Sequence, residues 1–206
     1  MRLENRTCLG LWVITETMVS SEKLLSGKFL HVKRDVVRLP NGREAGREYV
    51  VHPGAVVLIP LLDNGDVVLE RQFRYPIGQV MIEFPAGKLD PGEEPLVCGL
   101  RELHEETGYT ASEWAYAGPI HLAIAYSTEV IHAYFVRGLS AGQRALDPDE
   151  FLEVFTAPAQ QLLAWCADGT VTDAKTLSCA MHLSQYLSGQ RELGWQSVPR
   201  MARATA

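Results

Sequence analysis

The sequence has few cysteines, no excess of basic residues and no long apolar run. Its four cysteines form no Cys-x-x-Cys pair, which argues against a disulfide scaffold and a cysteine-rich zinc site. The formal net charge of −6 argues against the broad basic surface that a polynucleotide partner needs. No apolar stretch approaches the roughly 18 residues that span a bilayer, and the N-terminus lacks a secretory pattern. We therefore expect a cytoplasmic protein with no nucleic-acid or membrane partner.

The remaining composition is typical of a compact folded protein. Apolar residues make up 47% of the 206 positions and charged residues 21%, near the averages for globular chains. This length suits one domain with or without a small extension. We expect a β-rich extension over residues 1–52, the main domain over 53–190 and a tail over 191–206.

Apolar periodicity predicts a mixed β-sheet with helices packed on it. Residues 1–20 have no clear period and are expected to form a loose leader or an arm on a partner subunit, whereas 28–52 alternate around a Pro-Asn-Gly turn and predict a hairpin. The continuous apolar run over 55–62 is typical of a strand buried on both faces. Further strands are expected over 67–73, 114–122, 131–136 and near 151–155, and helices over 94–107, 158–167 and 173–187. The fold class is therefore α/β, or α+β where strands and helices are segregated.

Three carboxylates on the expected helix over 94–107 are the first candidates for chemistry. Glu102, Glu105 and Glu106 stand at i, i+3 and i+4, so they share one helix face. Their negative charges repel one another there. A hard divalent cation would relieve this repulsion, because Mg²⁺ prefers carboxylate and carbonyl oxygens. The glycines before the helix allow a tight loop that brings the Ala86 carbonyl near the ion, and Arg101 can orient a carboxylate or pair with Glu93. A solvated acidic helix is the alternative.

The spacing of these residues resembles the Nudix box. Every fixed position of its pattern is matched, and only the last aliphatic position departs, in Gly87-x5-Glu93-x7-Arg101-Glu102-Leu103-x-Glu105-Glu106-x-Gly108-Tyr109. The resemblance implies an α/β/α sandwich that hydrolyses a nucleoside diphosphate linked to another moiety, with Mg²⁺ or Mn²⁺. It further implies metal binding by Ala86, Glu102, Glu105 and Glu106, with Arg101, Glu105 and Glu106 in the catalytic set.

Flanking segments are similar to ADP-ribose pyrophosphatases within that family. These segments are residues 70–75, 83–93, 127–132, 149–154 and 169–176. The resemblance implies that Arg74 contacts phosphate or ribose and that Glu150 is the general base. Glu129, Glu83 and Arg71 are the further candidates for substrate binding. It also implies a homodimer in which the N-terminal β-rich part is the dimerisation element.

One departure keeps the substrate open. ADP-ribose pyrophosphatases usually carry Ser-Pro-Gly shortly before the position of Ser127, where this chain has Ala123-Ile124-Ala125. The leading expectation is Mg²⁺-dependent hydrolysis of ADP-ribose to AMP and ribose 5-phosphate. A pyrophosphatase for GDP-mannose or another nucleotide sugar is the second expectation. A Nudix module that senses ADP-ribose without cleaving it is the third, although its expected erosion of the box is not seen.

Overall fold

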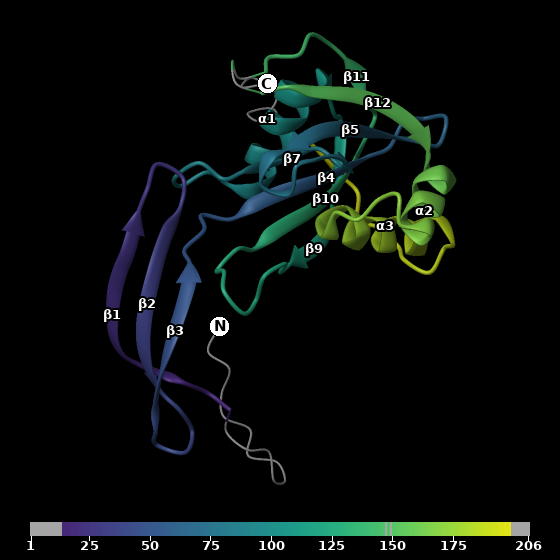
Figure 1. Cartoon of the computed structure of the whole chain (residues 1–206). Helices are drawn as coiled ribbons and strands as arrows, with labels where there is room; N and C mark the ends of the chain where they lie inside the picture. The colour runs from purple at the N-terminus through teal and green to yellow at the C-terminus, as the bar shows by residue number, and fades with distance from the viewer. Residues whose placement is uncertain (1–13, 147, 149, 199–206) are drawn as a thin grey trace. The chain divides into compact units, whose positions relative to one another are not determined.

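A computed structural model describes residues 14–198 apart from 147 and 149. Residues 1–13, which include Cys8, and residues 199–206 belong to the expected extension and tail and lie outside the described part. The chain divides into two compact units (Figure 1). One comprises the chain up to His52 with Ala123–Thr128, and the other comprises Pro53–Leu122 and the chain from Glu129 onward.

The first unit is a three-stranded antiparallel sheet in the order β1-β2-β3. Its strands are β1 (Thr17–Ser26), β2 (His31–Arg38) and β3 (Glu44–Val50). Gly42 has a φ of 83° in the turn between β2 and β3, so the predicted hairpin and its turn are confirmed. The strand β1 was not expected from the sequence. It is exposed along its whole length, and therefore lacks the apolar alternation by which a half-buried strand is identified.

A five-stranded mixed sheet forms the centre of the second unit, in the order β13-β9-β10-β4-β7. Its strands are β4 (Ala55–Pro60), β7 (Ala86–Lys88), β9 (Glu113–Ile120), β10 (Ile131–Arg137) and β13 (Gln196–Ser197). The pair β4 and β10 is parallel and the other pairs are antiparallel. The sheet is thus mixed, as predicted.

Helices cover both faces of this sheet, and the side chains of β4 show how. Val56 and Leu58 pack in one core with buried residues of α1 (Pro95–Thr107). Val57 and Ile59, which point the other way, pack in a second core with residues of α2 (Ala159–Asp168) and α3 (Ala174–Leu187). All of β4 is buried. The α/β/α sandwich and the strand buried on both faces are therefore confirmed.

A second sheet in the same unit has the order β12-β5-β6. It contains β5 (Asp66–Arg74), β6 (Gln79–Glu83) and β12 (Leu152–Pro158), with a short 3-10 helix, η1 (Tyr75–Ile77), between β5 and β6. A small pair of strands, β8 (Tyr109–Thr110) and β11 (Ser140–Ala141), completes the unit. Of the helices in the described part of the chain, none has the length and apolarity to cross a membrane.

Candidate active site

Helix α1 places the acidic cluster by burying its opposite face. Leu100 and Leu103 are buried against β4 and β10. Gly99 lets the helix come close to the sheet, because a Cβ there would lie 3.1 Å from Leu58 Cδ2. The helix ends at Gly108, whose φ of 75° suits glycine and whose N–H donates to the His104 carbonyl. The glutamates therefore project from a helix that packing holds in place.

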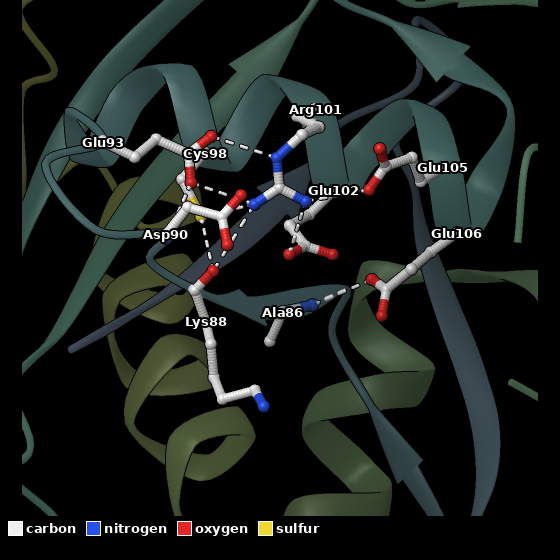
Figure 2. A network of polar contacts seen from close by, with 9 residues as sticks. All are labelled: Ala86, Lys88, Asp90, Glu93, Cys98, Arg101, Glu102, Glu105 and Glu106. Carbon is white, nitrogen blue, oxygen red and sulfur yellow. Dashed lines mark hydrogen bonds and ion pairs between the residues drawn. The ribbon is translucent and has the colours of Figure 1, made fainter. Parts of the chain in front are cut away.

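Arg101 is the centre of the polar network on α1 (Figure 2). Its Nε lies 3.0 Å from Glu93 Oε1 and its Nη2 lies 2.9 Å from Glu93 Oε2, so the pair is bidentate. Its Nη1 donates to Glu102 Oε1 at 2.9 Å and to Glu105 Oε2 at 2.8 Å. The hydrogen bonds from Arg101 lower the pKa of Glu93 despite its partial burial. The expected pairing of Arg101 with Glu93 is thus present.

Glu106 lies deeper than the other two glutamates of the cluster. Its relative exposure is 4%, and its Oε2 accepts a hydrogen bond from the Ala86 backbone N–H at 3.1 Å (Figure 2). Burial raises the pKa of Glu106 well above its ordinary value, and the charges of Glu70, Glu102 and Glu150 raise it further. Glu106 therefore favours a proton or a cation close to its carboxylate.

Strand β7 passes directly beside the carboxylate of Glu102. A Cβ added to Gly87 would lie 1.9 Å from Glu102 Cδ, so only a glycine leaves this carboxylate where it is. Burial raises the pKa of Glu102, and its ion pair with Arg101 opposes that rise. This close contact explains why the motif begins with glycine, which the sequence alone did not show.

The donor set of this face fits a hard divalent cation. Glu102, Glu105 and Glu106 offer carboxylate oxygens from one side, and the peptide of Ala86 lies within hydrogen-bond reach of Glu106. With the side chains as they stand, no three carboxylate, imidazole or thiolate groups in the described part of the chain are close enough together to hold one ion. Glu102 and Glu105 each form an ion pair with Arg101 instead. The three glutamates would therefore have to move closer together to hold one ion.

Arg74 and Glu83, two of the expected substrate-binding residues, form a bidentate pair. Arg74 Nε donates to Glu83 Oε1 at 2.8 Å and Nη2 donates to Oε2 at 2.7 Å. Lys175 also donates to Glu83 Oε2. Burial alone would raise the pKa of Glu83, but Arg74 and Lys175 together hold it below its ordinary value. Glu83 is thus ionised and already bonded, so Arg74 is the member of the pair that can reach a substrate.

The structure does not bring Arg71 to this pair. Arg71 and Arg74 are three positions apart on β5 and therefore point to opposite faces of the sheet. Arg71 binds Glu153 at 3.2 Å, and its guanidinium lies 3.9 Å above the ring centre of Phe155. The expected role of Arg71 in substrate binding therefore has no support in its surroundings.

Glu129 and Glu150 both lie in coil segments next to strands. Glu129 stands shortly before β10, and Glu150 shortly before β12. The negative charge of Glu150 is among those that raise the pKa values of Glu102 and Glu106. Glu150 therefore lies within electrostatic reach of the acidic face of α1, as a general base must.

Sequence reasoning missed Glu70. It lies on β5, is fully buried, and neither carboxylate oxygen has a hydrogen-bond partner among the described residues. Burial and the charge of Glu83 together raise the pKa of Glu70 to about 8, although Lys175 and Arg74 oppose the rise. The available signal was a single glutamate directly after the apolar stretch 67–69. Its position on β5 and its electrostatic interactions with Glu83, Arg74 and Glu106 connect the Arg74 pair with the acidic face of α1.

Comparisons with known proteins agree with this geometry. The family model for the NUDIX domain matches residues 51–178, and the model for the nucleoside diphosphate sugar hydrolase N-terminal domain matches residues 16–50. An ADP-ribose pyrophosphatase of Bacillus subtilis (strain 168) is 37% identical over 172 residues, which cover 82% of this chain and 93% of that protein. A methanol dehydrogenase activator of Bacillus methanolicus is 35% identical over 170 residues, covering 82% and 92%.

Other relatives and one solved structure extend the comparison. Among the relatives are proteins named ADP-sugar pyrophosphatase and GDP-mannose pyrophosphatase. The crystal structure of an ADP compounds hydrolase superposes with a TM-score of 0.76 at 22% identity, covering 85% of this chain and 95% of that one. That likeness concerns the fold. With three glutamates of the box on one face of α1 and most of the chain matched, the protein belongs to the Nudix hydrolase family.

Proposed function

We propose that the protein hydrolyses the diphosphate linkage of ADP-ribose to AMP and ribose 5-phosphate, with Mg²⁺, or Mn²⁺ in its place, as cofactor. The observation that carries the proposal is the acidic face of α1, which carries Glu102, Glu105 and Glu106 and has Gly87 directly beside Glu102. The relative named ADP-ribose pyrophosphatase, which aligns with most of the chain, supports the choice of substrate.

Each residue of the site has a distinct task in this reaction. Glu102, Glu105 and Glu106 would hold the divalent cation, and Arg101 keeps the first two in place until it arrives. When bound, the cation neutralises charge on the diphosphate. The guanidinium of Arg74 binds a phosphate oxygen, since its side chain is 40% exposed beside a buried partner. A carboxylate near the cation then takes the proton of the attacking water.

Glu150 is the residue that we propose as that base. Its position in a coil before β12 lets the side chain move toward substrate. Its negative charge raises the pKa values of Glu70, Glu102 and Glu106. Replacement by Gln would lower kcat and leave KM near its original value, because a base acts in the transition state. An unchanged kcat would transfer the role to another carboxylate.

A nucleotide-sugar pyrophosphatase of the GDP-mannose type is the second candidate. The observation that favours it is Ile124, which stands where ADP-ribose pyrophosphatases usually have the proline of Ser-Pro-Gly. The relatives named GDP-mannose pyrophosphatase support it as well. A module that binds ADP-ribose without cleavage has less support, because all three glutamates of the box are intact.

We also propose that the protein is a cytoplasmic homodimer, with residues 1–52 as the dimerisation element, 53–190 as the hydrolase domain and 191–206 as a tail. The first unit supports a dimer because β1 exposes apolar side chains that a second subunit would cover, namely Met18, Val19, Leu24 and Leu25. The described cysteines are free thiols, as in a reducing compartment. Light scattering after gel filtration tests the dimer, and a monomeric mass at micromolar concentration would contradict it.

The decisive experiment is product analysis with a matched pair of variants. Purified protein with Mg²⁺ is given ADP-ribose, ADP-glucose, GDP-mannose or NADH, and the products are separated by ion exchange. Preferential release of AMP and ribose 5-phosphate from ADP-ribose supports the proposal, whereas preference for GDP-mannose supports the second candidate. Glu106→Gln should lower kcat by several orders of magnitude, and Glu113→Gln, an exposed pair with Arg137, should not. Absence of cleavage for every substrate would refute both candidates.

A further inference from the structure

The N-terminus of α3 is tied to the end of β6. Asp173 caps this helix, because its side chain accepts a hydrogen bond from Thr176 N at 2.9 Å. The Thr176 hydroxyl in turn accepts one from the Phe84 backbone N–H at 3.1 Å. Two segments separated by about ninety positions are thus fixed against each other. The sequence singled out this stretch, residues 169–176, as family-like, yet the reaction described above gives it no task.

Lys175 is the charged residue at this junction. Its Nζ donates to Glu83 Oε2 and, at 3.0 Å, to Asp173 Oδ2. Its side chain is only 10% exposed. Removing an ammonium group from water is expensive unless carboxylates compensate it. Lys175 satisfies this condition with two partners, one of which is the carboxylate that holds Arg74.

Four neighbouring charges of alternating sign therefore connect the N-cap of α3 with the exposed guanidinium of Arg74. They run from Asp173 through Lys175 and Glu83 to Arg74. Exposure rises sharply only at the last step, from 2% for the Glu83 side chain to 40% for that of Arg74. Glu83 Oε2 accepts hydrogen bonds from both Lys175 and Arg74 Nη2. The orientation of the carboxylate plane is thus shared between the buried ammonium and the exposed guanidinium.

We propose that Lys175 is a positioning residue for substrate binding, which acts by fixing the Glu83 carboxylate so that Arg74 presents its guanidinium to the diphosphate. The inference rests on the proposed function, since it assumes that Arg74 binds a substrate phosphate. Without Lys175, Glu83 keeps its bond to Arg74 but can rotate about its side-chain torsions, and the guanidinium rotates with it. Arg74 then has to be ordered by the substrate, which weakens binding.

The test compares Lys175→Met with Arg74→Met and the double variant, using ADP-ribose and Mg²⁺. We expect Lys175→Met to raise KM about tenfold and to change kcat less than threefold, because the lost interaction concerns binding. The double variant should resemble Arg74→Met alone, since Lys175 acts through Arg74. Lys175→Arg, which keeps a cation beside Glu83, should recover most of the affinity. Lys33→Met, the same change on β2, is the matched control and should keep the original KM.

Three results would overturn the inference: an unchanged KM in Lys175→Met, fully additive losses in the double variant, or a fall confined to kcat. If Lys175→Met does not fold, Lys175→Gln retains a hydrogen-bond donor for Glu83 and is judged by the same criteria. Calorimetric titration of ADP-ribose in EDTA measures the affinity without turnover. Turnover of ADP-ribose by the original protein tests the proposed function, and the titration tests the positioning of Arg74. An absence of turnover would therefore refute the proposed function and leave the positioning of Arg74 to be judged by the titration.

Discussion

Replacement of Glu70 by Gln should stabilise the protein, and the gain should grow with pH. Glu70 is fully buried on β5, and within the part of the chain that the structure describes neither of its carboxylate oxygens has a hydrogen-bond partner. Burial and the charge of Glu83 raise the pKa of Glu70 to about 8, although Lys175 and Arg74 oppose the rise. At neutral pH the folded protein therefore holds this carboxyl mostly protonated, whereas the unfolded chain has it ionised.

The size of the effect follows from the two pKa values. The ordinary value is 4.5 and the value in the fold about 8, a difference of about 3.5 units, and each unit corresponds to about 1.4 kcal/mol. Because the folded pKa is the higher one, the unfolded state gains stability from ionisation as the pH rises from 4.5 to 8. The stability of the original protein should fall by up to about 5 kcal/mol over this window from Glu70 alone. A glutamine does not titrate, so the free energy of unfolding of the variant does not fall with pH for this reason.

Urea unfolding followed by circular dichroism at pH 5, 6, 7 and 8, in EDTA, measures the difference. The free energy of unfolding of Glu70→Gln should exceed that of the original protein by an amount that increases at each step. Glu113→Gln is the control, because its pKa is lowered by Arg137 and its loss removes a favourable surface pair. A gain that stays constant from pH 5 to 8, or a variant that becomes relatively weaker as pH rises, would show that Glu70 is ionised in the fold.

Three further predictions concern the metal face and the core. Gly87→Ala should weaken Mn²⁺ binding about tenfold by calorimetry, because its methyl would displace the Glu102 carboxylate; equal affinity would refute the steric argument. Arg101→Lys should lower thermal stability and kcat together, since an ammonium cannot make the bidentate contact with Glu93, and unchanged values would show that the contact is dispensable. Phe135→Ala should cost about 3–5 kcal/mol in urea unfolding, because the ring is fully buried, and a loss under 1 kcal/mol would contradict that packing.

Those parts of the fold that bury one face were predictable from the sequence. Leu96, Leu100 and Leu103 recur at helical spacing, and the last two are buried against the sheet as expected. The continuous apolar run that became β4 likewise predicted burial on both faces. Strand β1 was missed because no apolar alternation marks a strand that is exposed throughout. Periodicity therefore identifies elements by the core they contact, and is uninformative where there is none.

Within the site, the local motif was predictable and the long-range pairs were not. The three glutamates and Arg101 lie within one helix, so their spacing fixes their mutual geometry. The contact of Lys175 with Glu83 joins positions 92 apart and depends on how α3 packs beside β6. No local pattern encodes that packing. The burial of Glu70 depends in the same way on strand pairing, which decides what a side chain of β5 faces.

The close approach of α1 to the sheet limits which substitutions the motif can accept. The seven residues between Glu93 and Arg101 are unspecified in the family pattern, yet position 99 lies in that interval. A methyl group there would stand 3.1 Å from Leu58 Cδ2, so either the leucine or the helix has to shift. A shift of the helix would carry all three glutamates with it, because they share one rigid element. Variation at an unspecified position can thus alter cation affinity without touching a ligand, and Gly99 is where such variation should be rarest.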